Sequence, residues 1–152
     1  MLMHKKGRFH INGLSFALPD DVCILTRETP YNNLNGFVLT GFDQKIQVII
    51  DTEDDIEEPE EYFKSDGFTK HMHILSEIKT YENNGIKGAY VFCETKSEQY
   101  CEMRLKLPVP NDEATILSVC VLVQKGSLSV GQAVEMPFIR EFLSSIKKIS
   151  NK

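Results

Sequence analysis

The run of residues 114–123, with the sequence ATILSVCVLV, restricts the fold of this chain more than any other feature. It is apolar at both odd and even positions, whereas a strand with one face in water would alternate. It is also far shorter than the roughly 20 residues that a membrane-spanning helix needs. We therefore expect a central strand in a sheet that is covered by further layers on both faces.

The segments that precede this run predict its neighbours in the sheet. The turn sequence Asn83-Asn84-Gly85 favours a hairpin between residues 74–82 and residues 86–95. Residues 72–82 also match the spacing of an amphipathic helix, and we choose the strand because of this turn. Residues 99–107 alternate between an apolar face, expected in the core, and a more hydrated face. The apolar face carries Cys101, Met103, Leu105 and Leu107, and the hydrated face carries Tyr100, Glu102, Arg104 and Lys106.

The loop between residues 86–95 and 99–107 decides which residues of these two strands lie opposite each other. A three-residue loop, 96–98, places Cys93 opposite Cys101 on one face, and a five-residue loop places Cys93 opposite Met103. We favour the shorter loop. We expect reduced sulfurs, because the four cysteines lack the paired spacing of zinc sites and redox motifs.

The N-terminal third predicts two further hairpins. Residues 13–17 and 22–27 flank a turn that contains proline, which presets a turn dihedral angle. Residues 37–42 and 45–51 are rich in β-branched and aromatic residues and are separated by a short polar pair. Consecutive hairpins indicate an antiparallel sheet.

Two helices complete the pattern. Pro59, a good first helical residue, follows several acidic residues of the block 51–61, and we expect its helix to end around residue 71. A terminal helix is expected over about residues 137–149. Its apolar stripe consists of Phe138, Ile139, Phe142, Leu143 and Ile146.

The chain of 152 residues has the length of one ordinary domain. We expect residues 1–152 to form a single α+β domain with its core at about residues 11–149. Its antiparallel sheet should have about six to seven strands and be flanked by helices, because strands in consecutive hairpins argue against a parallel βαβ fold.

Three segments resemble the Mog/PsbP-like (DcrB-like) family: LSFALPD at residues 14–20, YENNGIKGAY at residues 81–90 and FLSSI at residues 142–146. The resemblance implies an α-β-α sandwich. It also implies a binding or accessory role, because the family includes a Ran-binding nuclear transport factor, photosystem accessory subunits and bacterial envelope proteins such as DcrB, mostly without catalysis. It transfers no functional residue to this chain.

Charge and motifs disfavour several classes of function. Acidic residues outnumber basic ones by 22 to 17, and the resulting net charge of −5 disfavours nucleic acid and anionic membranes as partners. The first residues lack the apolar stretch of an export signal, so we expect a cytoplasmic location. The sequence has no phosphate-binding glycine loop and no nucleophile elbow. We therefore assign no catalytic residue, no metal and no cofactor.

The acidic block is the main candidate for a functional surface. We predict that four of its residues face water and meet a basic partner protein. These four are Asp54, Asp55, Glu57 and Glu58. A solvated helix start is the competing interpretation, and a calcium site of the EF-hand type would need a spacing that the block lacks. His71 and His73 could supply two metal ligands if both lay on one strand face, but no third ligand is specified nearby. We therefore prefer to interpret them as two solvated histidines at a helix end.

These observations support a non-catalytic binding or accessory protein that acts through protein–protein interaction. The alternative is a small-ligand carrier with a cavity between sheet and helix, and a small hydrolase is a third hypothesis. The residues that could line such a cavity are Phe37, Phe42, Tyr62, Phe63 and Phe68. A pocket of about 300 Å³ or more with converging polar groups would favour the carrier. A histidine bonded to a carboxylate in a cleft would favour the hydrolase.

Overall fold

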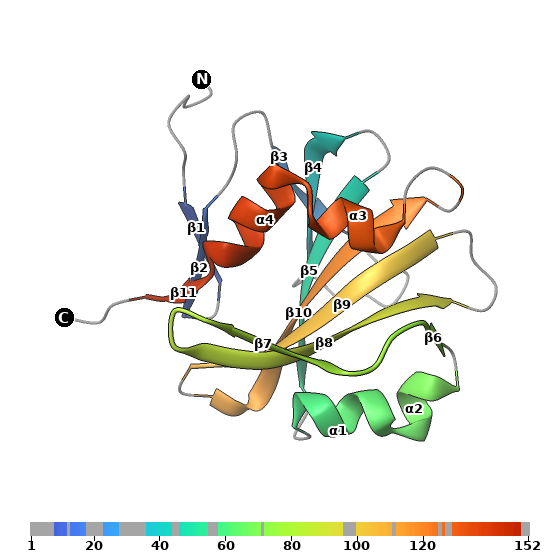
Figure 1. The fold of residues 1–152 in the computed structure, drawn as a ribbon. Coiled ribbons are helices and arrows are strands. Elements are labelled where there is room, and N and C mark those ends of the chain that lie inside the picture. The colour runs from blue at the N-terminus through green and yellow to red at the C-terminus, as the bar shows by residue number, and fades with distance from the viewer. Residues whose placement is uncertain are drawn as a thin grey trace.

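The computed structural model of this protein describes residues 8–11, 13–17, 23–27, 36–43, 46–54, 58–70, 72–95, 100–110, 112–124, 126 and 129–149. The strands of its main sheet are β3 (Cys23–Arg27), β4 (Gly36–Asp43), β5 (Ile46–Asp54), β6 (Met72–Ile74), β7 (Lys79–Asn83), β8 (Ile86–Thr95), β9 (Tyr100–Val109) and β10 (Asp112–Gln124). Their order is β3-β4-β5-β10-β9-β8-β6, and β7 also pairs with β8 (Figure 1). Every pair is antiparallel, which confirms the predicted α+β class.

Strand β10 is the central strand that the apolar run predicts. It lies between β5 and β9 and pairs with both along most of its length. Leu117, Val119 and Val121 are buried on one face, and Ser118 and Cys120 are buried on the other. Both faces of this strand are therefore covered, as its double-sided apolar pattern requires.

The predicted hairpins on either side of this strand are largely confirmed. Strands β4 and β5 form one pair, and β7 and β8 form the other. Asn84 and Gly85 both have positive φ angles, of 51° and 78°, which is the backbone of a type I′ hairpin turn. Residues 72–82 are extended as two short strands instead of one. Because β6 and β7 pair with successive parts of β8, the main sheet is seven strand positions wide.

The hairpin expected between residues 13–17 and 22–27 is wrong. Strand β2 (Leu14–Ala17) belongs to a separate small sheet with β1 (Arg8–Ile11) and β11 (Lys147–Lys148), whereas β3 pairs with β4. The side chain of Phe16 explains this placement, because it is fully buried and stacks on the ring of Phe142, with ring centroids 5.6 Å apart. Strand β2 is therefore held by the C-terminal part of the chain.

The terminal helix is shorter than expected. Helix α4 (Pro137–Ser144) is followed by Ser145, whose hydroxyl oxygen accepts a hydrogen bond of 2.9 Å from the backbone N–H of Ala17 in β2. The following residues Lys147 and Lys148 are extended and pair with β2. The predicted stripe is otherwise confirmed, because Ile139, Phe142 and Ile146 are fully buried and Phe138 and Leu143 are half-buried.

The first helical segment is divided into two short helices, α1 (Pro59–Lys64) and α2 (Asp66–Thr69). Ser65 between them is extended, with φ −73° and ψ 152°, and its hydroxyl donates to the carbonyl of Tyr62. This break allows Phe63 and Phe68 to be buried against the same core. A further helix, α3 (Val130–Val134), was not predicted, although Ser129 and Gln132 form a capping box at its start.

Opposite faces of the main sheet carry two separate hydrophobic cores. The larger core includes residues of α3 and α4, and the smaller one includes residues of α1 and α2 (Figure 1). No helix in the described part of the chain is long and apolar enough to cross a membrane.

The pairing of β8 with β9 corrects the predicted cysteine register. Cys93 lies opposite Glu102, and Cys101 lies opposite Glu94, so the two cysteines point to opposite faces. This register sends the large rings of Tyr90 and Phe92 towards the larger core, and it sends the small side chains of β8 towards α1 and α2. Those small side chains are Ala89, Val91 and Cys93. The loop 96–98 lies outside the described residues.

Candidate functional site

The face of β9 that alternation predicts to be hydrated is instead buried beneath α1 and α2. It carries the buried charge cluster, which we define as Glu102, Arg104 and Lys106. Only 6% of Glu102 and none of Lys106 is exposed to water. Alternation correctly placed these three residues on one face, but only the docking of the helix pair decided that this face is covered.

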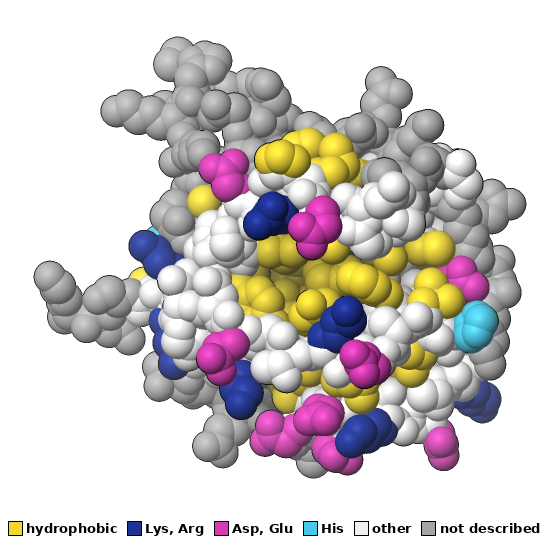
Figure 2. All heavy atoms as spheres, viewed as in Figure 1, with side chains coloured by type: hydrophobic (Ala, Val, Ile, Leu, Met, Phe, Trp, Pro, Cys, Tyr) yellow, Lys and Arg dark blue, Asp and Glu magenta, His cyan; other side chains and the backbone are white. Residues whose placement is uncertain are grey.

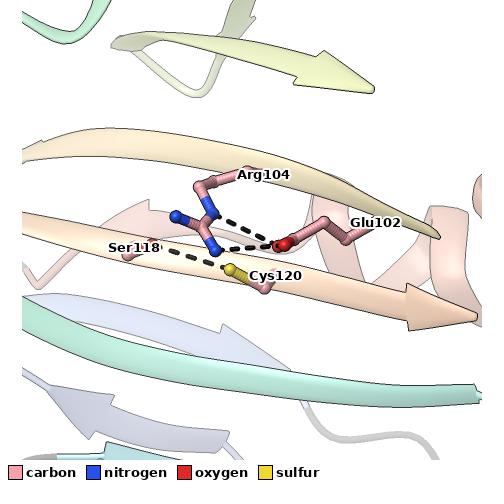
Figure 3. Close-up of polar contacts among 4 residues, drawn as sticks. All are labelled: Glu102, Arg104, Ser118 and Cys120. Carbon is pink, nitrogen blue, oxygen red and sulfur yellow. Dashed lines mark hydrogen bonds and ion pairs between the residues drawn. The ribbon is translucent and has the colours of Figure 1, made fainter. Parts of the chain in front are cut away.

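The charges of this cluster are paired with each other and with aromatic rings. The Nε and Nη2 atoms of Arg104 donate to the two carboxylate oxygens of Glu102 at 3.2 and 3.0 Å (Figure 3). The guanidinium of Arg104 lies 5.6 Å from the ring centroid of Phe68, and the Nζ atom of Lys106 lies 4.1 Å from that of Tyr62. These cation–π contacts link the sheet to both short helices.

Two cysteines on the same face of the sheet border this cluster. Burial raises the pKa of the Cys120 thiol to about 12, and the nearby Glu102 carboxylate acts in the same direction. Burial also raises the pKa of Cys93. The hydroxyl of Ser118 lies 3.7 Å from the sulfur of Cys120 (Figure 3). Because a thiolate and not a thiol is the reactive form, these two side chains are poor nucleophiles at neutral pH.

An open cleft of about 530 Å³ lies beside the start of α1, and we call it the acidic cleft. Its helical side is formed by residues 58–61, and its other side is formed by residues of β7, β8 and the segment before β7. The lining residues are Glu58, Pro59, Glu60, Glu61, Ile78, Thr80, Lys87, Gly88 and Ala89. The three glutamates and Lys87 are exposed, so carboxylates outnumber lysines on this lining.

The structure describes the side chain of only one of the four acidic residues predicted as a partner surface. Glu58 is exposed and lines the acidic cleft. Asp54 is the last residue of β5, and its side chain lies outside the described part of the structure. Asp55 and Glu57 lie outside the described residues altogether. The structure therefore brings Glu58 together with Glu60 and Glu61 of the same acidic block.

Some residues of the acidic cleft were missed as site residues. Glu61 lies three residues after Glu58, a spacing that places both on one side of a helix, so this signal was present in the sequence. Lys87 and Thr80 reach the cleft only through the register of β7 and β8, in which Lys87 pairs with Glu82 and Thr80 pairs with Ala89. Such cross-strand positions follow from tertiary pairing and not from local spacing.

The structure describes only one of the two histidines considered as metal ligands. His71 lies outside the described residues, and His73 is an exposed residue of β6 with its Nδ1 atom 3.2 Å from a carboxylate oxygen of Glu94. The sulfur of Cys101 lies 3.6 Å from the other oxygen of Glu94. These residues are not among those that line the acidic cleft. Within the described residues, no group of three or more His, Cys, Asp or Glu side chains could hold a metal ion.

The aromatic residues proposed to line a carrier's cavity pack against each other where they are described. The rings of Phe63 and Phe68 are buried, with their centroids 5.1 Å apart, and that of Tyr62 lies 5.4 Å from Phe68. The side chains of Phe37 and Phe42 lie outside the described part. The three described rings thus form the smaller core and its contact with the buried charge cluster.

Comparison with known proteins gives a likeness of fold. No family model matches the chain, and no protein with a curated description is similar to it. A crystal structure from Bacteroides thetaiotaomicron VPI-5482 is similar, with a TM-score of 0.58 and 12% sequence identity over 98% of this chain. The match covers 50% of that structure's chain, so this protein spans about half its length.

Proposed function

We propose that this chain is a non-catalytic binding or accessory protein that binds a basic protein partner through the acidic cleft. The proposal includes an α-β-α sandwich of the Mog/PsbP-like type and a cytoplasmic location. Among the described cysteines, the buried thiols of Cys93 and Cys120 form no disulfide, which supports a reducing compartment.

The lining of the acidic cleft is the observation that carries this proposal. Three exposed glutamates, Glu58, Glu60 and Glu61, lie within four consecutive residues of its helical side. Like charges on one helical turn repel each other, and one or two carboxylates already give the favourable interaction with the helix dipole. A partner that places lysine or arginine side chains in the cleft would relieve this repulsion. It would also associate faster at low ionic strength, because unlike charges attract over about 10 Å at 0.1 M salt.

The chemistry of the other polar groups supports binding over catalysis. The buried charge cluster is covered by α1 and α2, and its carboxylate is already held by Arg104. The thiols of Cys93 and Cys120 have raised pKa values, with burial as the main cause. Neither arrangement offers an activated nucleophile to a substrate in solution.

A pull-down from the native host with matched charge variants tests the proposal. The test variant is Glu58→Gln, Glu60→Gln and Glu61→Gln together. The control is Glu77→Gln, Glu135→Gln and Glu141→Gln, which removes the same charge from exposed residues that do not line the acidic cleft. We expect only the test variant to lose a partner that the unchanged protein retains at low salt.

A third variant, with Asp54, Asp55, Glu57 and Glu58 converted to Asn and Gln, examines the rest of the predicted surface. Retention of every partner by all variants, with unchanged salt dependence, would show that the acidic block is only a solvated edge.

A further inference from the structure

A hollow lined by hydrophobic side chains opens on the face of the molecule shown in Figure 2. In the same view, helices α3 and α4 lie on one side of it and the β7–β8 hairpin on the other (Figure 1). We call it the apolar hollow. The half-buried hydrophobic residues of the elements that border it are Tyr81, Tyr90, Phe92, Val134, Met136, Phe138 and Leu143. All of them pack on the larger core.

Hydrogen bonds hold the two sides of the apolar hollow together at one end. The hydroxyl of Tyr81 on β7 donates to the carbonyl of Leu143 on α4. The side-chain amide of Asn83 donates to the carbonyl of Ser144 at 2.7 Å, and that of Asn84 donates to the carbonyl of Ile146 at 3.0 Å. These contacts fix the β7–β8 hairpin against the end of α4.

The lysine side chain of Lys79 lies beside this apolar surface. Lys79 lies opposite Tyr90 in the β7–β8 pairing, so both side chains are on the face that carries α3 and α4. Lys79 is half-buried, and its Nζ atom lies 5.5 Å from the ring centroid of Phe92. It forms no ion pair with any residue of the described part of the chain. The ammonium group of Lys79 therefore lies over an aromatic ring, and no carboxylate among the described side chains pairs with it.

We propose that the apolar hollow binds a small amphiphile with one negative charge, of the class of medium-chain fatty acids. The aliphatic chain would cover Tyr90, Phe92 and the neighbouring wall of α3 and α4, and its carboxylate would pair with Lys79. A single ammonium group suits a single charge, and a charge-assisted hydrogen bond is stronger where water is partly excluded.

Calorimetric titration of the full chain with decanoate tests this site. Lys79→Gln removes the charge, Lys79→Arg retains it, and Lys87→Gln is the matched control. Lys87 is an exposed lysine on the other face of the same hairpin, and it lines the acidic cleft. We expect Lys79→Gln to weaken decanoate binding by about tenfold, the effect of one charge-assisted hydrogen bond. We expect Lys79→Arg and Lys87→Gln to bind as the unchanged protein does.

The uncharged probe 1-decanol separates the two parts of the proposal. It should bind the unchanged protein more weakly than decanoate, and it should not distinguish Lys79→Gln from the unchanged protein. Amide NMR shifts should change in β7, β8, α3 and α4 and not in residues 58–61, the helical side of the acidic cleft. Circular dichroism of each variant confirms its folding. Absence of decanoate binding, equal loss in Lys79→Gln and Lys87→Gln, or shifts scattered over the surface would each overturn the proposal. This test is independent of the pull-down, because it measures another surface of the protein.

Discussion

Glu102 and Arg104, two residues apart on the same face of β9, form a two-pronged ion pair beneath the aromatic side of α1 and α2. The pair is largely removed from water, since 8% of the Glu102 side chain and 22% of the Arg104 side chain are exposed. Two buried charges are tolerated here because the attraction between them offsets the hydration free energy that each lost on burial. The consequence is that neither residue can be removed alone without leaving an unpaired charge against the smaller core.

We predict that Glu102→Met destabilises the protein by about 3 kcal/mol, the lower end of the range for breaking a buried pair. The lower end applies because part of the Arg104 side chain still contacts water. The double variant Glu102→Met with Arg104→Met should be less destabilised than the single one, because it removes both members of this ion pair together. Urea unfolding of the three proteins measures both differences, and a double variant that is the least stable would contradict the prediction.

Phe142 is the apolar anchor between the terminal helix and β2. Its side chain is fully buried and stacks on Phe16. We expect Phe142→Ala to lower the free energy of unfolding by about 3 to 5 kcal/mol, because truncation of a buried ring leaves a cavity. Leu75, which is 47% exposed, provides the control, and Leu75→Ala should change stability by only about 0.5 kcal/mol. A shift in melting temperature of no more than a degree for Phe142→Ala would show that the helix is not docked there.

The Cys120 thiol should lower the free energy of unfolding as the pH becomes alkaline. Its pKa rises from 9.0 to about 12 in the folded protein, first because of burial. Between these two values the unfolded chain releases the proton while the folded protein retains it, so the free energy of unfolding falls as pH rises. One thiol contributes up to about 1.4 kcal/mol per pH unit in this window. Urea unfolding at pH 8, 9 and 10 should therefore show a smaller loss for Cys120→Ala than for the unchanged protein, and parallel curves would refute this.

Gly88 and Gly67 should respond to alanine in opposite directions. A Cβ atom on Gly88 would collide with the backbone carbonyl oxygen of Lys106 and lie 2.9 Å from a methyl group of Leu107, so β8 and β9 would have to separate. We expect a loss of at least about 2 kcal/mol, as for other overpacked sites. A Cβ atom on Gly67 in α2 would meet nothing closer than 4.0 Å, and alanine should stabilise this exposed helical position by up to about 1 kcal/mol. Thermal unfolding of both variants measures the contrast, and a stable Gly88→Ala protein would disprove the close approach.

The elements that the sequence predicts correctly are those with a local cause. The turn at Asn84 and Gly85 needs two residues that tolerate positive φ, and their side chains are themselves the signal. The run of β10 is apolar on both faces, so it had to lie in the middle of a covered sheet wherever its partners came from. Pro59 marked the start of α1 because its φ angle suits the first turn of a helix.

The other features depended on contacts between distant parts of the chain. Alternation in β9 separates its two faces but does not say whether helices also cover the polar one, and the docking of Phe63 and Phe68 decided that Glu102 and Lys106 are buried. The proline-containing turn predicted that β2 pairs with β3. The burial of Phe16 against Phe142 instead places β2 in a different sheet. Hydrophobic burial has no direction and no preference for near neighbours in sequence, so the partner of an apolar face is chosen only when the whole chain packs. For the same reason the sequence indicated an acidic surface that includes Glu58, whereas the cleft itself, its second wall at Lys87 and the apolar hollow beside Lys79 came only from the tertiary structure.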